Sequence, residues 1–255
     1  MSMTLYLDSF GGLDKKGLYS PAGFTPWDTH QTDAADVRRD QVLDKPYISF
    51  GKLSIADKLA FAAASLLFAH YPECRDPSTG IVLGTVHGSL STDLRYQESL
   101  ISGFPSPAIF SATLPSSAVS DVAIYYGLKG PNRVLCGEDS TIDAFDFGIG
   151  MLAHGKADTV VVLAINALEA SDRSSPLAFA ADRDNSAFAF LLTTRKKGPG
   201  LNLKFGFSFS GTAPTPEKPD VYLNDLVRHL LERKPGEIPF VSHHSQGSFL
   251  LAKDQ

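Results

Sequence analysis

Short apolar runs alternate with longer stretches of helical periodicity along most of this chain. Runs rich in Val, Ile, Leu and Phe are typical of buried strands, whereas apolar residues three and four positions apart are typical of helices. Strands are predicted at residues 5–10, 81–85, 133–136, 159–165 and 186–193. Helices are predicted at residues 54–71, before residue 100, at 114–126 and at 139–154. This alternation predicts the α/β class.

The helix at residues 54–71 has the clearest local signals. Ser54 followed by Asp57 matches the S-x-x-D pattern of a helix start. The middle of the helix is rich in alanine, which predicts a buried helix packed closely on its neighbour. The segment from about residue 11 to Lys45 shows no clear periodicity and is rich in Gly, Pro, Asp and Thr. We expect it to be a long surface excursion.

Residues 133–136, 139–154 and 159–165 form a predicted strand–helix–strand unit. Such crossovers join parallel strands, so we expect the unit at the centre of a largely parallel sheet, with strand 186–193 adjacent. A tight turn separates the first strand from the helix. The turn exposes a side chain at a helix N-terminus, where free N–H groups favour negative charge. A nucleophile would belong at this position.

The composition changes after Lys197, through the letters KKGPG. We therefore divide the chain into residues 1–197 and a shorter segment, 198–255. The shorter segment alternates at 201–210, which predicts a half-exposed strand with Phe205, Phe207 and Phe209 on one face. A helix at 221–233 and a strand at 238–242 are predicted to follow.

Composition limits the partners. The chain has 255 residues, 43% of them hydrophobic, and a formal net charge of −5. It is long enough to bury a core as one or two closely joined lobes. The negative charge gives no attraction for nucleic acid or anionic lipid, and no apolar run has a spanning length. Two distant cysteines and the lack of a signal-peptide pattern lead us to expect a cytoplasmic protein.

Three short motifs point to a known family: GLKGPN at 127–132, CGEDST at 136–141 and GKAD at 155–158. In this order and spacing the chain resembles the β-ketoacyl synthases of the thiolase-like superfamily. Together with the stretch at 110–118, it is most similar to short ketoacyl-synthase-like chain-length factors of aryl-polyene-type pathways. The resemblance implies a thiolase-like layered fold with a mixed, largely parallel central sheet and a truncated second half.

The same resemblance identifies the candidate site residues. Counting back from GKAD places Glu138 where the family has its catalytic cysteine, and Cys136 falls two residues early. The motif IPFVSHHSQGS at 238–248 is similar to a histidine motif of the family's second half, with His244 at the histidine. No residue is predicted to be catalytic. Cys136, Ser140 and His244 are minor candidates, and Glu138 is expected to hold the turn rather than to react.

Other polar residues have simpler interpretations. Asp139 is expected to cap the helix that follows, and His87 to be a solvated loop residue. Adjacent His243 and His244 would face opposite ways on a strand, which is poor for joint metal binding. We expect no metal site, and no segment has a nucleotide-binding glycine pattern. No cofactor is predicted.

Loss of the nucleophile leaves three functions open. The resemblance implies a non-catalytic chain-length-factor-type subunit that partners an active ketoacyl synthase and an acyl carrier protein in fatty-acid-like or polyketide biosynthesis. It also implies a homo- or heterodimer that buries residues 113–126 and 133–136. One alternative is a self-sufficient condensing or acyl-transfer enzyme of 3-oxoacyl synthase type, whose active site departs from the family's arrangement. The other alternative is an acyl-binding scaffold.

Overall fold

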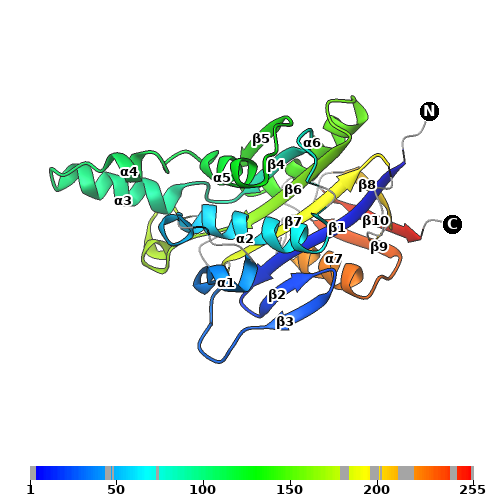
Figure 1. The fold of residues 1–255 in the computed structure, drawn as a ribbon, viewed down its shortest axis with the longest axis horizontal. Helices are drawn as coiled ribbons and strands as arrows, with labels where there is room; N and C mark the ends of the chain where they lie inside the picture. The colour runs from blue at the N-terminus through cyan, green and yellow to red at the C-terminus, as the bar shows by residue number, and fades with distance from the viewer. Residues whose placement is uncertain are drawn as a thin grey trace.

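A ten-stranded mixed sheet organises the chain in the computed structural model (Figure 1). The structure describes residues 4–43, 47, 49–72, 75–178, 184–195, 201, 203–211, 221–241 and 246–253. The strands are β1 (Leu5–Asp14), β2 (Gly17–Ser20), β3 (Gly23–Pro26), β4 (Gly80–Thr85), β5 (Asn132–Cys136), β6 (Thr159–Asn166), β7 (Ser186–Thr193), β8 (Leu203–Gly211), β9 (Gly236–Val241) and β10 (Gln246–Lys253). The helices are α1 (Arg39–Val42), α2 (Ile55–Ala69), α3 (Leu90–Ile101), α4 (Pro107–Phe110), α5 (Ser117–Tyr126), α6 (Ser140–Ala153) and α7 (Val221–Leu231), with short 3-10 turns such as η1 (Ala34–Asp36) and η4 (Ala170–Ser174).

The strand order is β5-β4-β6-β7-β1-β8-β10-β9, and the β2–β3 hairpin extends from β1. Parallel pairing joins β5, β4 and β6, whereas β7, β1, β8, β10 and β9 continue the sheet in antiparallel fashion. The layered α/β fold with a mixed sheet is thus confirmed, but the expectation that the sheet is largely parallel is wrong, because most of its strand pairs are antiparallel. The expected central position of β5 is wrong, because β4 lies between β5 and β6 and leaves β5 at the edge. Its exposed Asn132 and Arg133 suit that place.

Successive residues of the buried strands face opposite sides of the sheet, and each side has its own core. Ile81 and Leu83 belong to the core on the side of α2 and α5, while Val82 between them belongs to the core on the side of α6 and α7. This alternation is the period of two that a strand buried on both faces must have. Helices α3 and α4 extend away from both layers as an arm (Figure 1).

Helix α2 confirms the predicted start and the predicted close packing. Ser54 is the N-cap, and its hydroxyl accepts a hydrogen bond from the Asp57 N–H at 3.2 Å. A Cβ added to Gly11 of β1 would lie 2.3 Å from the backbone nitrogen of Leu67. The alanine-rich helix therefore lies directly on the sheet, at a distance that larger side chains would prevent.

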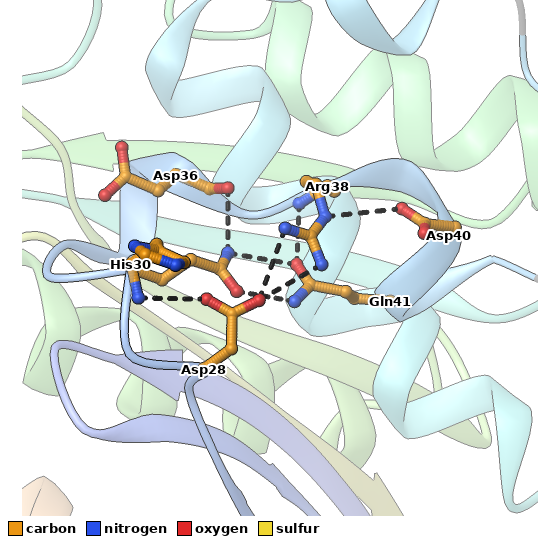
Figure 2. A network of polar contacts seen from close by, with 7 residues as sticks. Asp28, His30, Asp36, Arg38, Asp40 and Gln41 are labelled. Atoms are coloured by element: carbon orange, nitrogen blue, oxygen red, sulfur yellow. Dashed lines mark hydrogen bonds and ion pairs between the residues drawn. The ribbon is translucent and has the colours of Figure 1, made fainter.

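The expected surface excursion up to Lys45 is wrong for residues 11–20, whereas most residues from 21 to 43 are exposed or half-buried. Strand β1 runs on to Asp14, and β2 is buried throughout. The residues after β3 are ordered by polar contacts instead of apolar periodicity (Figure 2). Gln31 and Gln41 exchange amide hydrogen bonds of 3.1 and 2.6 Å, and Arg38 contacts Asp28 and Asp40. Contacts of this kind leave no periodic signal in the sequence.

The C-terminal strands continue the same sheet. β8 pairs with β1, and Phe205 and Phe249 lie in the cluster that surrounds α6. β8, α7 and β9 agree with the predicted strand, helix and strand, whereas β10 was not predicted. The division at residue 197 stays a prediction. Across the described residues no helix is long and apolar enough to cross a membrane.

Candidate functional site

The candidate site lies where the three parallel strands end. Thr85 closes β4, Cys136 closes β5 and Asn166 closes β6. In open α/β sheets, ligands bind outside the carboxyl ends of the strands. Polar residues at the ends of otherwise apolar strands are the signal that sequence analysis overlooked for Thr85 and Asn166.

The turn from β5 into α6 is held by backbone contacts. The Gly137 N–H donates to the Thr85 carbonyl at 3.1 Å, and the Ser140 N–H donates to the Gly137 carbonyl at 3.2 Å. Gly137 has φ of 133°, a conformation that L side chains rarely adopt. Glu138 and Asp139 follow, both half-buried, and α6 begins at Ser140. The structure thus has the strand, tight turn and helix that the sequence predicted.

Helix α6 is pressed against the sheet at its first residue. A Cβ on Gly84 would lie 2.2 Å from the Ser140 carbonyl oxygen. Asp139 occupies the N-cap position, but its side chain makes no capping hydrogen bond. The predicted N-cap position of Asp139 is therefore confirmed, whereas the predicted hydrogen bond between its side chain and the helix is wrong.

The minor nucleophile candidates have unfavourable surroundings. The Ser140 side chain is buried, and its hydroxyl has no hydrogen-bond partner within the described residues. A general base would have to contact this hydroxyl to activate it. Cys136 is exposed at the end of β5, and partial burial raises the pKa of its thiol. A raised pKa lowers the fraction of reactive thiolate near neutral pH.

Of the histidines considered from the sequence, the structure describes His87 but not His243 and His244. His87 follows β4 and is buried, so the expected solvated loop histidine is wrong. The cause is the short link from β4 to α3, where the Gly88 N–H donates to the Thr85 hydroxyl at 3.1 Å and holds the chain against the sheet. His243 and His244 lie outside the described residues.

Two asparagines at this edge were missed. The Asn185 amide donates to both carboxylate oxygens of Asp33 and accepts from the Leu168 N–H. Asn166 donates to the Asp184 carbonyl at 2.7 Å. They tie the loop after β6 and the segment before η1 to the start of β7. In the part of the chain that is described, no group of three or more His, Cys, Asp or Glu side chains is arranged to hold a metal ion.

Comparison with known proteins rests on structure alone. No protein-family model and no curated protein match the sequence. Solved structures do match. A chain of the complex of ketosynthase ApeO with its chain length factor ApeC, from Xenorhabdus doucetiae, has a TM-score of 0.70 at 16% identity, over 98% of this chain and 100% of that chain.

Two further structures are similar. The ishigamide ketosynthase/chain length factor has a TM-score of 0.66 at 16% identity, over 90% of this chain and 73% of that chain. The AntDE:AntF complex, a type II polyketide synthase acyl-carrier protein with its hexaketide-bound ketosynthase, has a TM-score of 0.61 at 14% identity, over 89% and 73%. The chain therefore has the thiolase-like fold of ketosynthases and chain length factors.

Proposed function

We propose that this protein is a non-catalytic, chain-length-factor-type subunit that pairs with an active ketosynthase in fatty-acid-like or polyketide biosynthesis. The observation that carries the proposal is Glu138, which stands in the turn before α6, where the resembling family has its cysteine. A carboxylate forms no stable thioester, so the turn lacks the group that would carry a growing acyl chain.

The described neighbours of Glu138 offer no ready substitute. Ser140 is buried without a base, and the thiol pKa of Cys136 is raised. A self-sufficient condensing enzyme would need one of them activated. The non-catalytic subunit is therefore favoured over that enzyme.

The partner classes follow from the similar structures. Two of them are assemblies of a ketosynthase with a chain length factor, and a third holds a ketosynthase with an acyl carrier protein. An active ketosynthase and an acyl carrier protein are the partners that we propose for this chain. The edge strand β5 and helix α5 are the proposed contact region, because β5 ends the sheet and no described strand pairs with its outer side.

Co-expression with a synthase of the same genome that retains its cysteine tests the proposal. We expect the two chains to co-purify, and labelled acyl-carrier protein to acylate the synthase and not this chain. Glu138→Gln is expected to leave the activity of the assembly largely intact, since an amide still accepts a hydrogen bond. Glu138→Cys is expected to create no synthase. Without the histidines of the resembling family, the new thiolate is not activated and the developing carbanion is not stabilised.

One result would contradict the proposed function. Saturable acylation of the isolated chain that is lost in Cys136→Ala or Ser140→Ala would make it an enzyme in its own right. Glu169→Gln, a carboxylate change in the loop after β6, is the control for nonspecific effects of charge removal.

A further inference from the structure

Residues 99–128, from the end of α3 through α5, are a continuous stretch of chain whose exposed side chains we call the arm surface. The stretch contains one charged side chain, Asp121. Six of the ten large apolar side chains that are exposed in the described part of the chain belong to it: Leu100, Ile101, Phe104, Phe110, Leu114 and Ile124. Exposed apolar side chains gathered in one stretch mark an interaction site, and interface cores are depleted of charge.

Helix α5 holds its part of this surface in a fixed position. The Ser117 hydroxyl donates to the Asp57 carboxylate of α2 at 2.6 Å. Near the other end of α5, the Tyr126 hydroxyl donates to the Ser65 hydroxyl at 2.8 Å. Because both ends are tied to the buried helix α2, Ile124 is presented to solvent, 80% exposed, from a rigid element.

Asp121 gives this apolar surface a distinct charge. It lies four residues after Ser117 and three before Ile124, so it shares their side of the helix. Asp57 beside it is 3% exposed. Burial, and then the Asp57 charge, raise the pKa of Asp121 to about 6. Within the described residues, neither carboxylate has an ion pair with a lysine or arginine.

This charge distinguishes between two kinds of occupant. A second copy of the chain, docked about a two-fold axis that passes near Asp121, would place the two copies of this carboxylate close together. Like charges brought together at an interface are costly. A different chain with a basic side chain at that point would instead supply the missing counter-charge.

We propose that the arm surface binds a chain different from itself: a synthase subunit that presents a lysine or arginine opposite Asp121, surrounded by apolar side chains. The inference rests on the proposed function and names the chemistry of its partner. Asp121 then selects the heterodimer over the homodimer, and the apolar side chains supply most of the binding free energy.

The test measures binding of the co-purifying synthase to purified variants, well above pH 6, at low and at high salt. Asp121→Asn is expected to weaken binding about tenfold or more at low salt and to flatten its salt dependence. Asp121→Lys is expected to weaken it further. Ile124→Ser is expected to weaken binding at both salt concentrations, because its contribution is apolar. Asp40→Asn, in α1, is the control and should bind like wild type.

Two results would overturn the inference alone: a complex that forms normally with Asp121→Asn and Asp121→Lys, or a stable homodimer of the wild-type chain that is insensitive to both changes. A synthase variant that replaces the opposing basic residue with glutamate should restore binding to Asp121→Lys and not to wild type. If no synthase of the genome binds the wild-type chain, the proposed function itself fails, and this inference fails with it.

Discussion

Asp121 lies in surroundings that are unfavourable for its charge. It is half-buried on α5, and Asp57 on α2 faces it. The hydroxyl groups of Tyr47 and Tyr125 belong to the same cluster: burial, then Asp121 and Asp57, raise the pKa of Tyr47. Since the folded-state pKa of Asp121 lies above its ordinary value, the folded state binds its proton more tightly than the unfolded chain does.

The isolated chain is therefore expected to gain stability from this residue as pH falls from about 6 toward 4, and to lose that gain as pH rises through 6. Asp121→Asn removes the charge, so it should stabilise the isolated chain at neutral pH by on the order of 1 kcal/mol after allowance for solvent. Urea unfolding across this pH range checks the prediction. A wild-type minus variant difference that does not change with pH would contradict it.

Single residues were placed correctly from the sequence where neighbouring residues in the chain determine their position. The motif spacing placed Glu138 correctly in the turn before α6, because turn and helix are built by neighbours in the chain. The burial of His87 was missed, since it arises from the fit of a short link against the sheet. Asn185 was missed as well, because its partner Asp33 is distant in sequence.

Helix α6 depends on one glycine beneath its first turn. Gly84→Ala would place a Cβ 2.2 Å from the Ser140 carbonyl, so the helix start must move away from β4. Overpacking of this kind costs about 1–3 kcal/mol, and we expect Gly84→Ala to destabilise the fold by at least that range. Denaturant unfolding measures the change.

Gly150, within α6, is the matched control. An added Cβ there meets nothing within 4 Å. Gly150→Ala should stabilise the protein by up to about 1 kcal/mol, because alanine favours the helix. Equal effects of the two substitutions would show that the contact of α6 with β4 is not the constraint.

The predicted elements were correct where apolar periodicity decided them. The α2 capping signal, the β5–α6–β6 unit and the strand β7 all have the type that their patterns indicated. The place of β5 at the edge was not predictable, because its neighbours are chosen by long-range pairing. β2 and the end of β1 were missed because their glycines and polar residues obscure the alternation.

The whole molecule is expected to unfold as one unit across the division at residue 197. Phe145 of α6 packs against Phe205 and Phe249, with ring centroids 6.0 and 4.9 Å away. Phe249→Ala should therefore cost about 3–5 kcal/mol and shift a single transition monitored at both ends of the chain. Two separate transitions would instead make residues 198–255 an independent domain.

The neighbour of Phe249 on β10 supplies the control. Leu250 is 50% exposed on the opposite face of the strand. Leu250→Ala is expected to change the free energy of unfolding by no more than about 0.5 kcal/mol.

The open edge of β5 also bears on the life of the chain before assembly. A freshly made chain would carry a strand edge that no described strand pairs and, on the same molecule, an arm of exposed apolar side chains. Both features are recognised by chaperones and both promote aggregation. Under the proposed function, cells that make this chain in excess over the synthase should therefore degrade the surplus, so that synthase abundance sets its steady-state level.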